Sequence, residues 1–198
     1  MPNSADNTKQ SHCRTPQVNS SASAWLGTQR TARDVVANAA AKATAGKGFG
    51  APKAGAAAKV PTKCPCGSGK TYENCCGRLH AGEPAPGPEA LLRARFSAYK
   101  LQLADYLVAT THLKNPEHTG DAKSYSRVVM KTARANTFIS LQVESQEPGA
   151  TEDEAFITFT VHTRHNAAAA QGRPADATRE KSQFVREGGR WLYRDCVE

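Results

Sequence analysis

The sequence lacks any long hydrophobic run. No stretch approaches the roughly 18 consecutive apolar residues that a membrane-spanning helix needs, and no apolar segment of the secretory kind follows Met1. Aromatic residues make up only 7% of the 198 residues. A glycine-rich phosphate loop and a Ser/His/Asp or Cys/His nucleophile arrangement are also absent from the sequence. These absences predict a protein that neither spans a membrane nor is secreted, and they favour a non-enzymatic function without deciding it.

Acidic residues are scarce in the first third of the chain. Residues 1–63 contain nine Lys or Arg and two acids, a net charge of +7, whereas the remainder contains 17 basic and 16 acidic residues, a net of +1. The segment is rich in Ala, Ser, Thr and Gly, and it cannot bury enough apolar surface to offset the entropy of ordering it. We therefore predict a disordered tail over residues 1–63.

The composition of this tail is open to three functional interpretations. An acid-poor, hydroxyl-rich, basic N-terminus is typical of transit peptides, which would direct the protein to a plastid such as the chloroplast or to a mitochondrion. A solvated tail on a cytoplasmic protein is the second interpretation. Nucleic-acid binding is the third, and it is less favoured because the tail has no interleaved aromatics on which bases could stack.

Four of the six cysteines lie within thirteen positions, as the pairs Cys64/Cys66 and Cys75/Cys76. Four thiolates can surround Zn²⁺ as a tetrahedron if the chain between the pairs turns back sharply, and the glycines of residues 67–69 permit such a turn. Disulfides are the alternative, but they are strained between adjacent cysteines and nothing here indicates export. We therefore predict one zinc ion on these four cysteines. Because the protein would fill every coordination position, the ion would be structural.

The cysteine string Cys-Pro-Cys-Gly-Ser-Gly-Lys, followed by Cys75-Cys76, resembles the SEC-C motif known from the tail of the SecA translocase motor. We call residues 64–82 the cysteine element. The strings that follow it resemble the YchJ family: Leu92 to Tyr99, Asp105-Tyr106-Leu107 with Thr111-His112, and Gln183 to Arg186 with Gly189-Arg190-Trp191. The resemblance implies a nuclear transport factor 2-like domain over residues 83–198. It also implies that the cysteine element docks a protein or ribonucleoprotein partner.

The residue pattern of this second domain independently predicts an α+β fold. A helix is expected to begin at Gly87-Pro88 and to end near Asn115-Pro116, because apolar residues recur at steps of three and four; they are Leu92, Phe96, Tyr99, Leu103 and Tyr106. A second helix is expected over residues 126–133. Alternating apolar residues then predict strands around 139–143 and 155–161, a loop over 166–178, and a hairpin of 181–186 and 190–197 turning at Gly188-Gly189. The expected architecture is a helix packed on one face of a curved antiparallel sheet.

The resemblance also implies that such a helix-on-sheet cone can hold a small-molecule pocket. Asp105 and His112 are the weak catalytic candidates within it, and the alternative function is an isomerase, lyase or hydrolase using that pocket. An acid within a helix is more often solvated, and a histidine at a helix end is more often bonded to the backbone. The favoured prediction is therefore a zinc-stabilised protein-interaction module. A further alternative is nucleic-acid or ribosome binding through the basic tail and the cysteine element.

Overall fold

The computed structural model describes residues 61–118 and 120–197, which belong to one compact unit. The predictions of a disordered tail and a transit peptide fall largely on residues 1–60 and lie outside the described residues. Residues 61–63 are described, however. The amide of Tyr72 donates to the Thr62 carbonyl at 3.2 Å, and Lys63 forms an antiparallel bridge with Thr71. Paired structure therefore begins at Thr62, just before the first cysteine.

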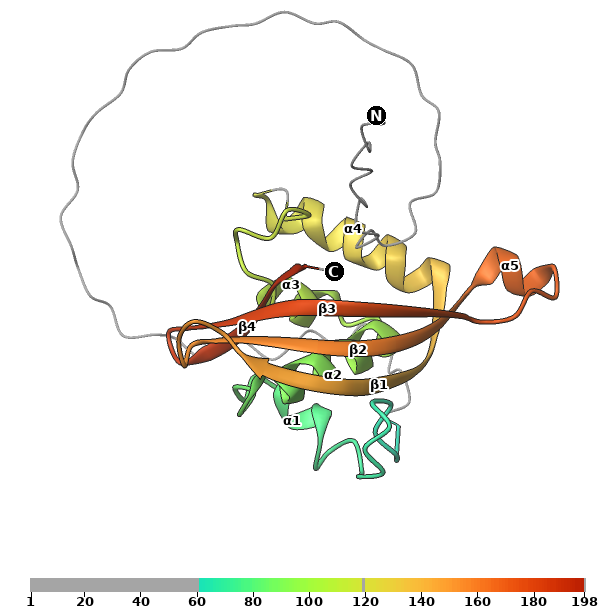
Figure 1. The fold of residues 1–198 in the computed structure, drawn as a ribbon. Coiled ribbons are helices and arrows are strands. Elements are labelled where there is room, and N and C mark those ends of the chain that lie inside the picture. Colours follow the sequence, from blue (N-terminus) through green and yellow to red (C-terminus); the bar gives the residue numbers. More distant parts are fainter. Residues whose placement is uncertain (1–60, 119, 198) are drawn as a thin grey trace, which may run out of the picture. The chain divides into compact units, whose positions relative to one another are not determined.

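Four antiparallel strands form one open sheet in the order β1-β2-β3-β4 (Figure 1). The predicted meander is confirmed. The strands are β1 Asn136–Pro148, β2 Glu154–His165, β3 Asp176–Glu187 and β4 Arg190–Cys196; the first three are longer than expected, and the last ends one residue earlier. Gly188 and Gly189 make the last turn with φ of 55° and 76°. A two-residue hairpin turn of this hand needs positive φ at both positions, which glycine adopts without strain.

The long predicted helix is in fact two helices, α2 Pro88–Leu101 and α3 Ala104–Ala109. The chain leaves α2 at Gln102, whose φ is 57°, and the Leu103 amide turns back to the Ala98 carbonyl at 2.9 Å. This is the Schellman pattern that ends helices, here without the usual glycine. The apolar period continues across the break, since Leu103 still packs against the core around Leu107, and the sequence pattern therefore concealed it.

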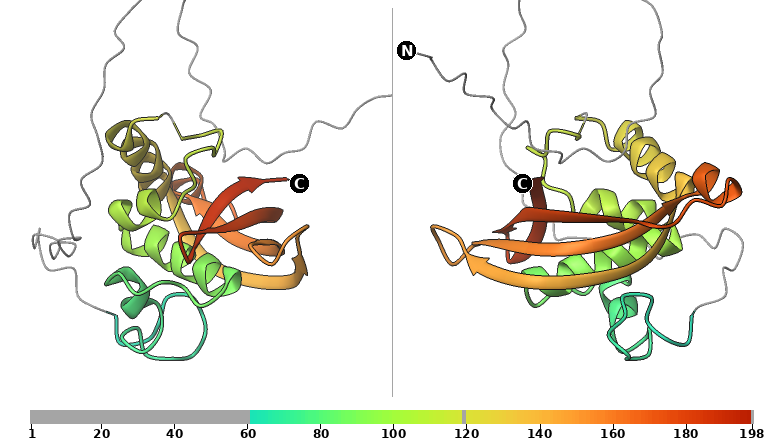
Figure 2. Two further views of the ribbon diagram at one scale, coloured as in Figure 1. Left: turned by 90° about the vertical axis from the view of Figure 1, so that its left-hand side faces the viewer. Right: turned by 45° about the vertical axis from the view of Figure 1, so that its right-hand side comes forward.

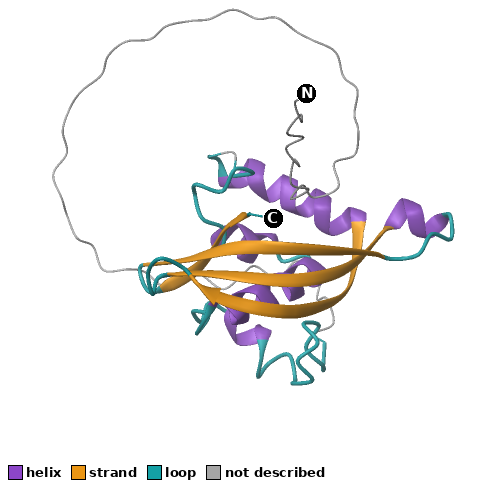
Figure 3. Cartoon of the chain, in the orientation of Figure 1, coloured by secondary structure: helices purple, strands orange, loops and turns teal. Residues whose placement is uncertain are grey.

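Two further helices flank the sheet (Figure 3). Helix α4, Ala122–Ala135, confirms the predicted second helix with longer bounds, and Asp121 caps it by accepting from the amides of Lys123 and Ser124. The predicted loop over residues 166–178 is wrong at both ends. Its alanine run forms the short helix α5, Asn166–Ala170, and β3 already begins at Asp176.

Helix α2 lies along one face of the curved sheet (Figure 2), so the predicted α+β architecture is confirmed. Its main core joins Leu91 and Leu92 of α2 to Ile157 of β2, Phe184 of β3 and Trp191 of β4. On β1 the alternation differs from expectation. A bulge between Phe138 and Ser140 turns Ile139 outward, where it is 40% exposed.

Within the described residues, no helix combines the length and the apolar character needed to cross a bilayer.

Candidate metal centre

The first cysteine pair lies on a chain segment that doubles back on itself. The Cys64 amide donates to the Lys70 carbonyl at 2.8 Å, which closes the loop beyond the Lys63–Thr71 bridge. Gly67 and Gly69 have φ of 82° and 77°, a backbone region that L side chains rarely adopt. The predicted glycine turn is therefore present, and it leaves Cys64 and Cys66 buried with 6% and 1% exposure.

The second pair is placed by the start of helix α1, Cys76–His80. The Gly77 amide donates to the Tyr72 carbonyl at 2.8 Å, and a Cβ added at Gly77 would lie 2.7 Å from that carbonyl oxygen. Only glycine permits this close approach of backbone to backbone. The sequence analysis did not single out Gly77, although its position directly after the cysteine pair was the available signal.

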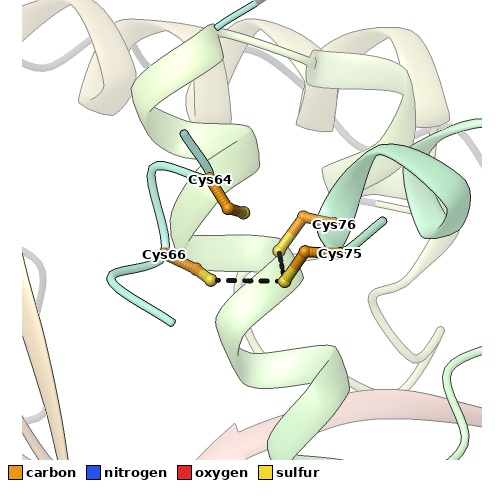
Figure 4. Close-up of side chains that lie close together, drawn as sticks. All are labelled: Cys64, Cys66, Cys75 and Cys76. Carbon is orange, nitrogen blue, oxygen red and sulfur yellow. Dashed lines mark hydrogen bonds between the residues drawn. The ribbon is translucent and has the colours of Figure 1, made fainter. Parts of the chain in front are cut away.

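The sulfur atoms of Cys64, Cys66, Cys75 and Cys76 all lie within 4.8 Å of one another (Figure 4). The Cys66–Cys75 separation is 3.7 Å and the Cys75–Cys76 separation is 3.9 Å. A tetrahedron of thiolates with Zn–S bonds of about 2.3 Å has sulfur–sulfur edges of about 3.8 Å. All four are free thiols. The four predicted ligands are therefore close enough together to hold a metal ion, and two of their separations match the edge of such a tetrahedron.

The electrostatics of the cluster favour a thiolate. Hydrogen bonding from the Cys76 side chain, reinforced by Ser68, lowers the pKa of Cys66 to about 4. The hydrogen bond that Cys76 makes to Cys66, together with burial, raises the pKa of Cys76, so that the two sulfurs share one proton. The Ser68 hydroxyl also lies 3.2 Å from the Cys75 sulfur. A cluster that stabilises one negative sulfur and protonates its neighbour is the arrangement in which a bound cation would replace the shared proton.

A buried hydroxyl supplies an independent test of whether these residues fit a metal. Ser97 of α2 is fully buried, and its Oγ has no well-formed hydrogen bond within the part of the chain described. Ser97 stands beside Cys76, since its hydroxyl acts to lower the pKa of that thiol. A metal-bound thiolate is a permanent acceptor, whereas a thiol is a weak one. The Ser97 hydroxyl, which has no other partner among the described residues, therefore fits a site whose Cys76 is deprotonated.

His80 at the end of α1 joins the cysteine element to α2. Its Nδ1 lies 2.7 Å from the Tyr72 hydroxyl and its Nε2 lies 2.9 Å from the Ala94 carbonyl. Since the carbonyl can only accept, Nε2 carries the proton and Tyr72 donates to Nδ1. Burial lowers the pKa of His80, which keeps the ring neutral. Small residues Ala90 and Ala94 of α2 admit the element this closely. Sequence reasoning missed this junction, because it depends on residues 14 positions apart.

The two weak catalytic candidates occupy different settings. Asp105 is exposed in the first turn of α3, whereas His112 is buried with 6% exposure. The His112 Nδ1 accepts from the Lys114 amide at 3.0 Å, so Nε2 donates to the Glu187 carboxylate at 2.9 Å. Both ring nitrogens are therefore engaged in contacts that hold the loop after α3 to the sheet.

Arg95, part of the family-like string, is buried with 5% exposure. Its Nη1 donates to the Leu107 carbonyl at 3.0 Å and to the hydroxyls of Thr110 and Thr111 at 2.8 and 3.0 Å. The guanidinium also lies 4.7 Å from the centroid of the Tyr193 ring. A cation at the carbonyl end of a helix is stabilised by the helix dipole. Arg95 therefore caps α3 and fixes the segment that carries His112.

Comparison with known proteins finds similarity over both parts of the described chain. The family "YchJ, middle NTF2-like domain" matches residues 87–196, and the family "SEC-C motif" matches residues 62–78. The solution structure of a SEC-C motif containing protein from Rhodopseudomonas palustris is 32% identical in sequence, with a TM-score of 0.55. That similarity covers 68% of this chain and 96% of the other.

A second solved structure shares the fold. The crystal structure of a SEC-C motif containing protein from Psychrobacter arcticus is 23% identical, with a TM-score of 0.51. The similarity covers 67% of this chain and 80% of the other.

Proposed function

The chain belongs to the YchJ family, with a SEC-C motif preceding a nuclear transport factor 2-like domain, and on this premise we propose that it is a zinc-stabilised protein-interaction module. One Zn²⁺ would be held by the sulfurs of Cys64, Cys66, Cys75 and Cys76. With four protein ligands the ion has no position for water, so it supplies rigidity rather than reaction chemistry.

The observation that carries this proposal is the convergence of four thiols within 4.8 Å beneath an exposed turn. Residues 67–71 are all exposed, while three of the four cysteines directly below them are buried. An isolated turn of this kind would be flexible, and ordering it on a partner would cost entropy. Metal coordination removes that cost before binding, so the turn can act as a pre-organised docking surface.

The partner that fits this surface is a protein or a ribonucleoprotein. Lys63 and Lys70 are exposed beside the turn, so an acidic or phosphate-bearing surface would complement it. The part-buried hydrogen bonds of His80 hold the cysteine element in a fixed orientation against α2. A fixed orientation suits a docking element, because no entropy is lost in orienting it when the partner binds.

The first experiment separates metal binding from docking. Metal analysis of the purified protein is expected to give one zinc ion per chain, and Cys75→Ser is expected to lose it. Lys70→Glu should keep the zinc, because its side chain is exposed and its contact in the loop is made by the backbone. A metal-free, oxidised wild-type protein would refute the site assignment.

The second experiment is affinity capture from a lysate with the same variants. A partner that the wild type captures is expected to be lost with both Cys75→Ser and Lys70→Glu. His112→Ala should retain the partner, because this residue lies in the loop after α3 and outside the cysteine element. If zinc loss leaves the captured partner in place while His112→Ala removes it, the docking proposal is wrong and the domain interior is the functional part.

A further inference from the structure

The charged residues on the solvent-facing side of helix α4 are all basic, and Val128 on the same helix is 42% exposed. Helix α4 has no Asp or Glu within Ala122–Ala135, and its buried residues are Tyr125, Val129 and Ala133. The opposite side is exposed and bears four cations, which we call the cationic face: Lys123, Arg127, Lys131 and Arg134. They recur at steps of four, four and three residues, so they form one stripe along the helix.

These four cations have no ion-pair partner among the described residues. Within residues 61–118 and 120–197, none of them lies within ion-pair distance of a carboxylate, whereas Arg78, Arg93, Arg179, Lys181 and Arg186 all do. The Asp121 carboxylate is occupied as the helix cap, although Arg127 contributes to lowering its pKa. Like charges three or four residues apart destabilise a helix. The stripe therefore lowers the stability of α4 in the isolated domain.

One more exposed cation lies just beyond the end of the helix. The Asn166 side chain donates to the Arg134 carbonyl at 2.7 Å, and exposed Arg164 pairs with Thr137 at the start of β1. Five acids gather at the other end of β1, around the turn into β2; they are Glu144, Glu147, Glu152, Asp153 and Glu154. Since residues 64–198 carry a net charge of only +1, the cationic face reflects segregation of charge and not an overall excess.

We propose that the cationic face binds the phosphate backbone of double-stranded nucleic acid without regard to sequence. At 1.5 Å per residue, the four cations span about 16 Å of helix, enough to face several successive phosphates. A single strand is less suitable, because the only aromatic of α4, Tyr125, is 2% exposed and cannot stack on bases. An anionic membrane is also less suitable, because the apolar side of α4 packs inside the protein and cannot insert.

The test measures the binding of the full-length zinc-bound protein to a fluorescent 20-base-pair RNA duplex of arbitrary sequence. Fluorescence anisotropy of the duplex gives the affinity at each of several salt concentrations. The variant K123Q/R127Q/K131Q/R134Q removes the stripe while keeping good helix formers. The matched control K100Q/K114Q/R173Q/R190Q removes the same charge from exposed sites outside both the stripe and the cysteine element. Zinc content and circular dichroism establish that both variants are folded.

Each phosphate contact contributes about 0.9 to the slope of log affinity against log salt. The stripe variant loses four such contacts and is therefore expected to bind at least about tenfold more weakly at 0.1 M salt, with a slope reduced by about 3.6. The control variant should bind the duplex with an affinity within about twofold of the wild type, and its slope should stay close to the wild-type slope. The slope is a sum over phosphate contacts. Any contacts made by residues 1–63 therefore add the same amount to the slope of every variant, and the difference in slope between the stripe variant and the wild type is unaffected. Equal losses in both variants, an unchanged slope, or binding to phosphatidylserine vesicles but not to the duplex would overturn the proposal.

Discussion

The hydroxyl of Ser97 and the sulfur of Cys76 lie 21 positions apart in the sequence, yet the hydroxyl acts directly on the pKa of that thiol. Donors beside a metal ligand orient the ligand and stabilise its charge. The proposed metal site would therefore be completed by the domain behind it, through a residue type that is common and carries no motif. In this respect α2 is part of the centre as well as its support.

Replacing Ser97 by Ala should weaken zinc binding about tenfold, because the Cys76 thiolate loses its donor while the four ligands remain. Competition with a chromophoric zinc chelator measures the change. Ser182→Ala is the matched control, since Ser182 Oγ is the other buried hydroxyl without a hydrogen bond in the described chain, and it lies on β3. Equal zinc affinity in wild type and Ser97→Ala would mean that the hydroxyl does not serve the metal.

Among the elements, α1 and α2 are held together by the neutral ring of His80. A proton on Nδ1 would displace the Tyr72 hydroxyl that donates to it, and burial opposes the added charge. The Tyr106 ring covers the imidazole edge-on, with centroids 4.5 Å apart. The junction between the cysteine element and α2 therefore depends on the protonation state of one side chain.

Acidification should weaken this junction. Because the pKa of His80 is lower in the folded protein than its ordinary value of about 6.5, the unfolded chain binds more protons below that pH. The stabilisation is complete above about pH 6.5 and is lost as the pH falls towards the folded pKa. His80→Gln should be less stable than wild type at pH 7.5, and the difference in melting temperature should shrink towards pH 5.

The measurement is thermal unfolding at each pH with zinc content verified, so that loss of metal is not mistaken for titration of the histidine. A stability difference that stays constant from pH 7.5 to pH 5 would contradict the role assigned to His80.

At the scale of the whole molecule, the described chain has separate apolar centres. One joins α2 to the sheet around Ile157 and Phe184, and another surrounds the cysteines with Leu79 and Ala94. Ala85 and Tyr106 pack against both. The second centre is small and gains much of its order from the sulfur cluster, so the two should differ in their dependence on metal.

Removing zinc with a strong chelator under reducing conditions should therefore release the cysteine element first. Hydrogen exchange is expected to rise about tenfold or more in residues 62–80, while β2 and β3 keep their protection. Mass spectrometry of peptides from both regions gives the comparison within one sample. Equal loss of protection in the sheet would contradict this prediction, because it would show that the whole domain unfolds when the metal is removed.

Local features made several parts of this structure predictable. The spacing of Cys64, Cys66, Cys75 and Cys76 around a glycine turn identified the candidate ligands, and Gly188-Gly189 identified the final hairpin. The break at Gln102 and the bulge at Ile139 were not predictable in the same way. Both interrupt an apolar period without a glycine or proline to mark the position, and tertiary packing alone selects them.

The amino-acid sequence by itself determined the helix-on-sheet architecture and the clustering of four thiols, because each follows from spacing, period or turn chemistry within a short stretch of chain. The family was identified from the resemblance of its motif strings. Only the tertiary structure decided that Ser97 faces Cys76, that His80 bonds to α2 and that Arg95 caps α3. It also decided that the cations of α4 face solvent on one side. These are relations between residues distant along the chain or between the two faces of a helix, and their physical origin is the burial of apolar surface that brings the elements together.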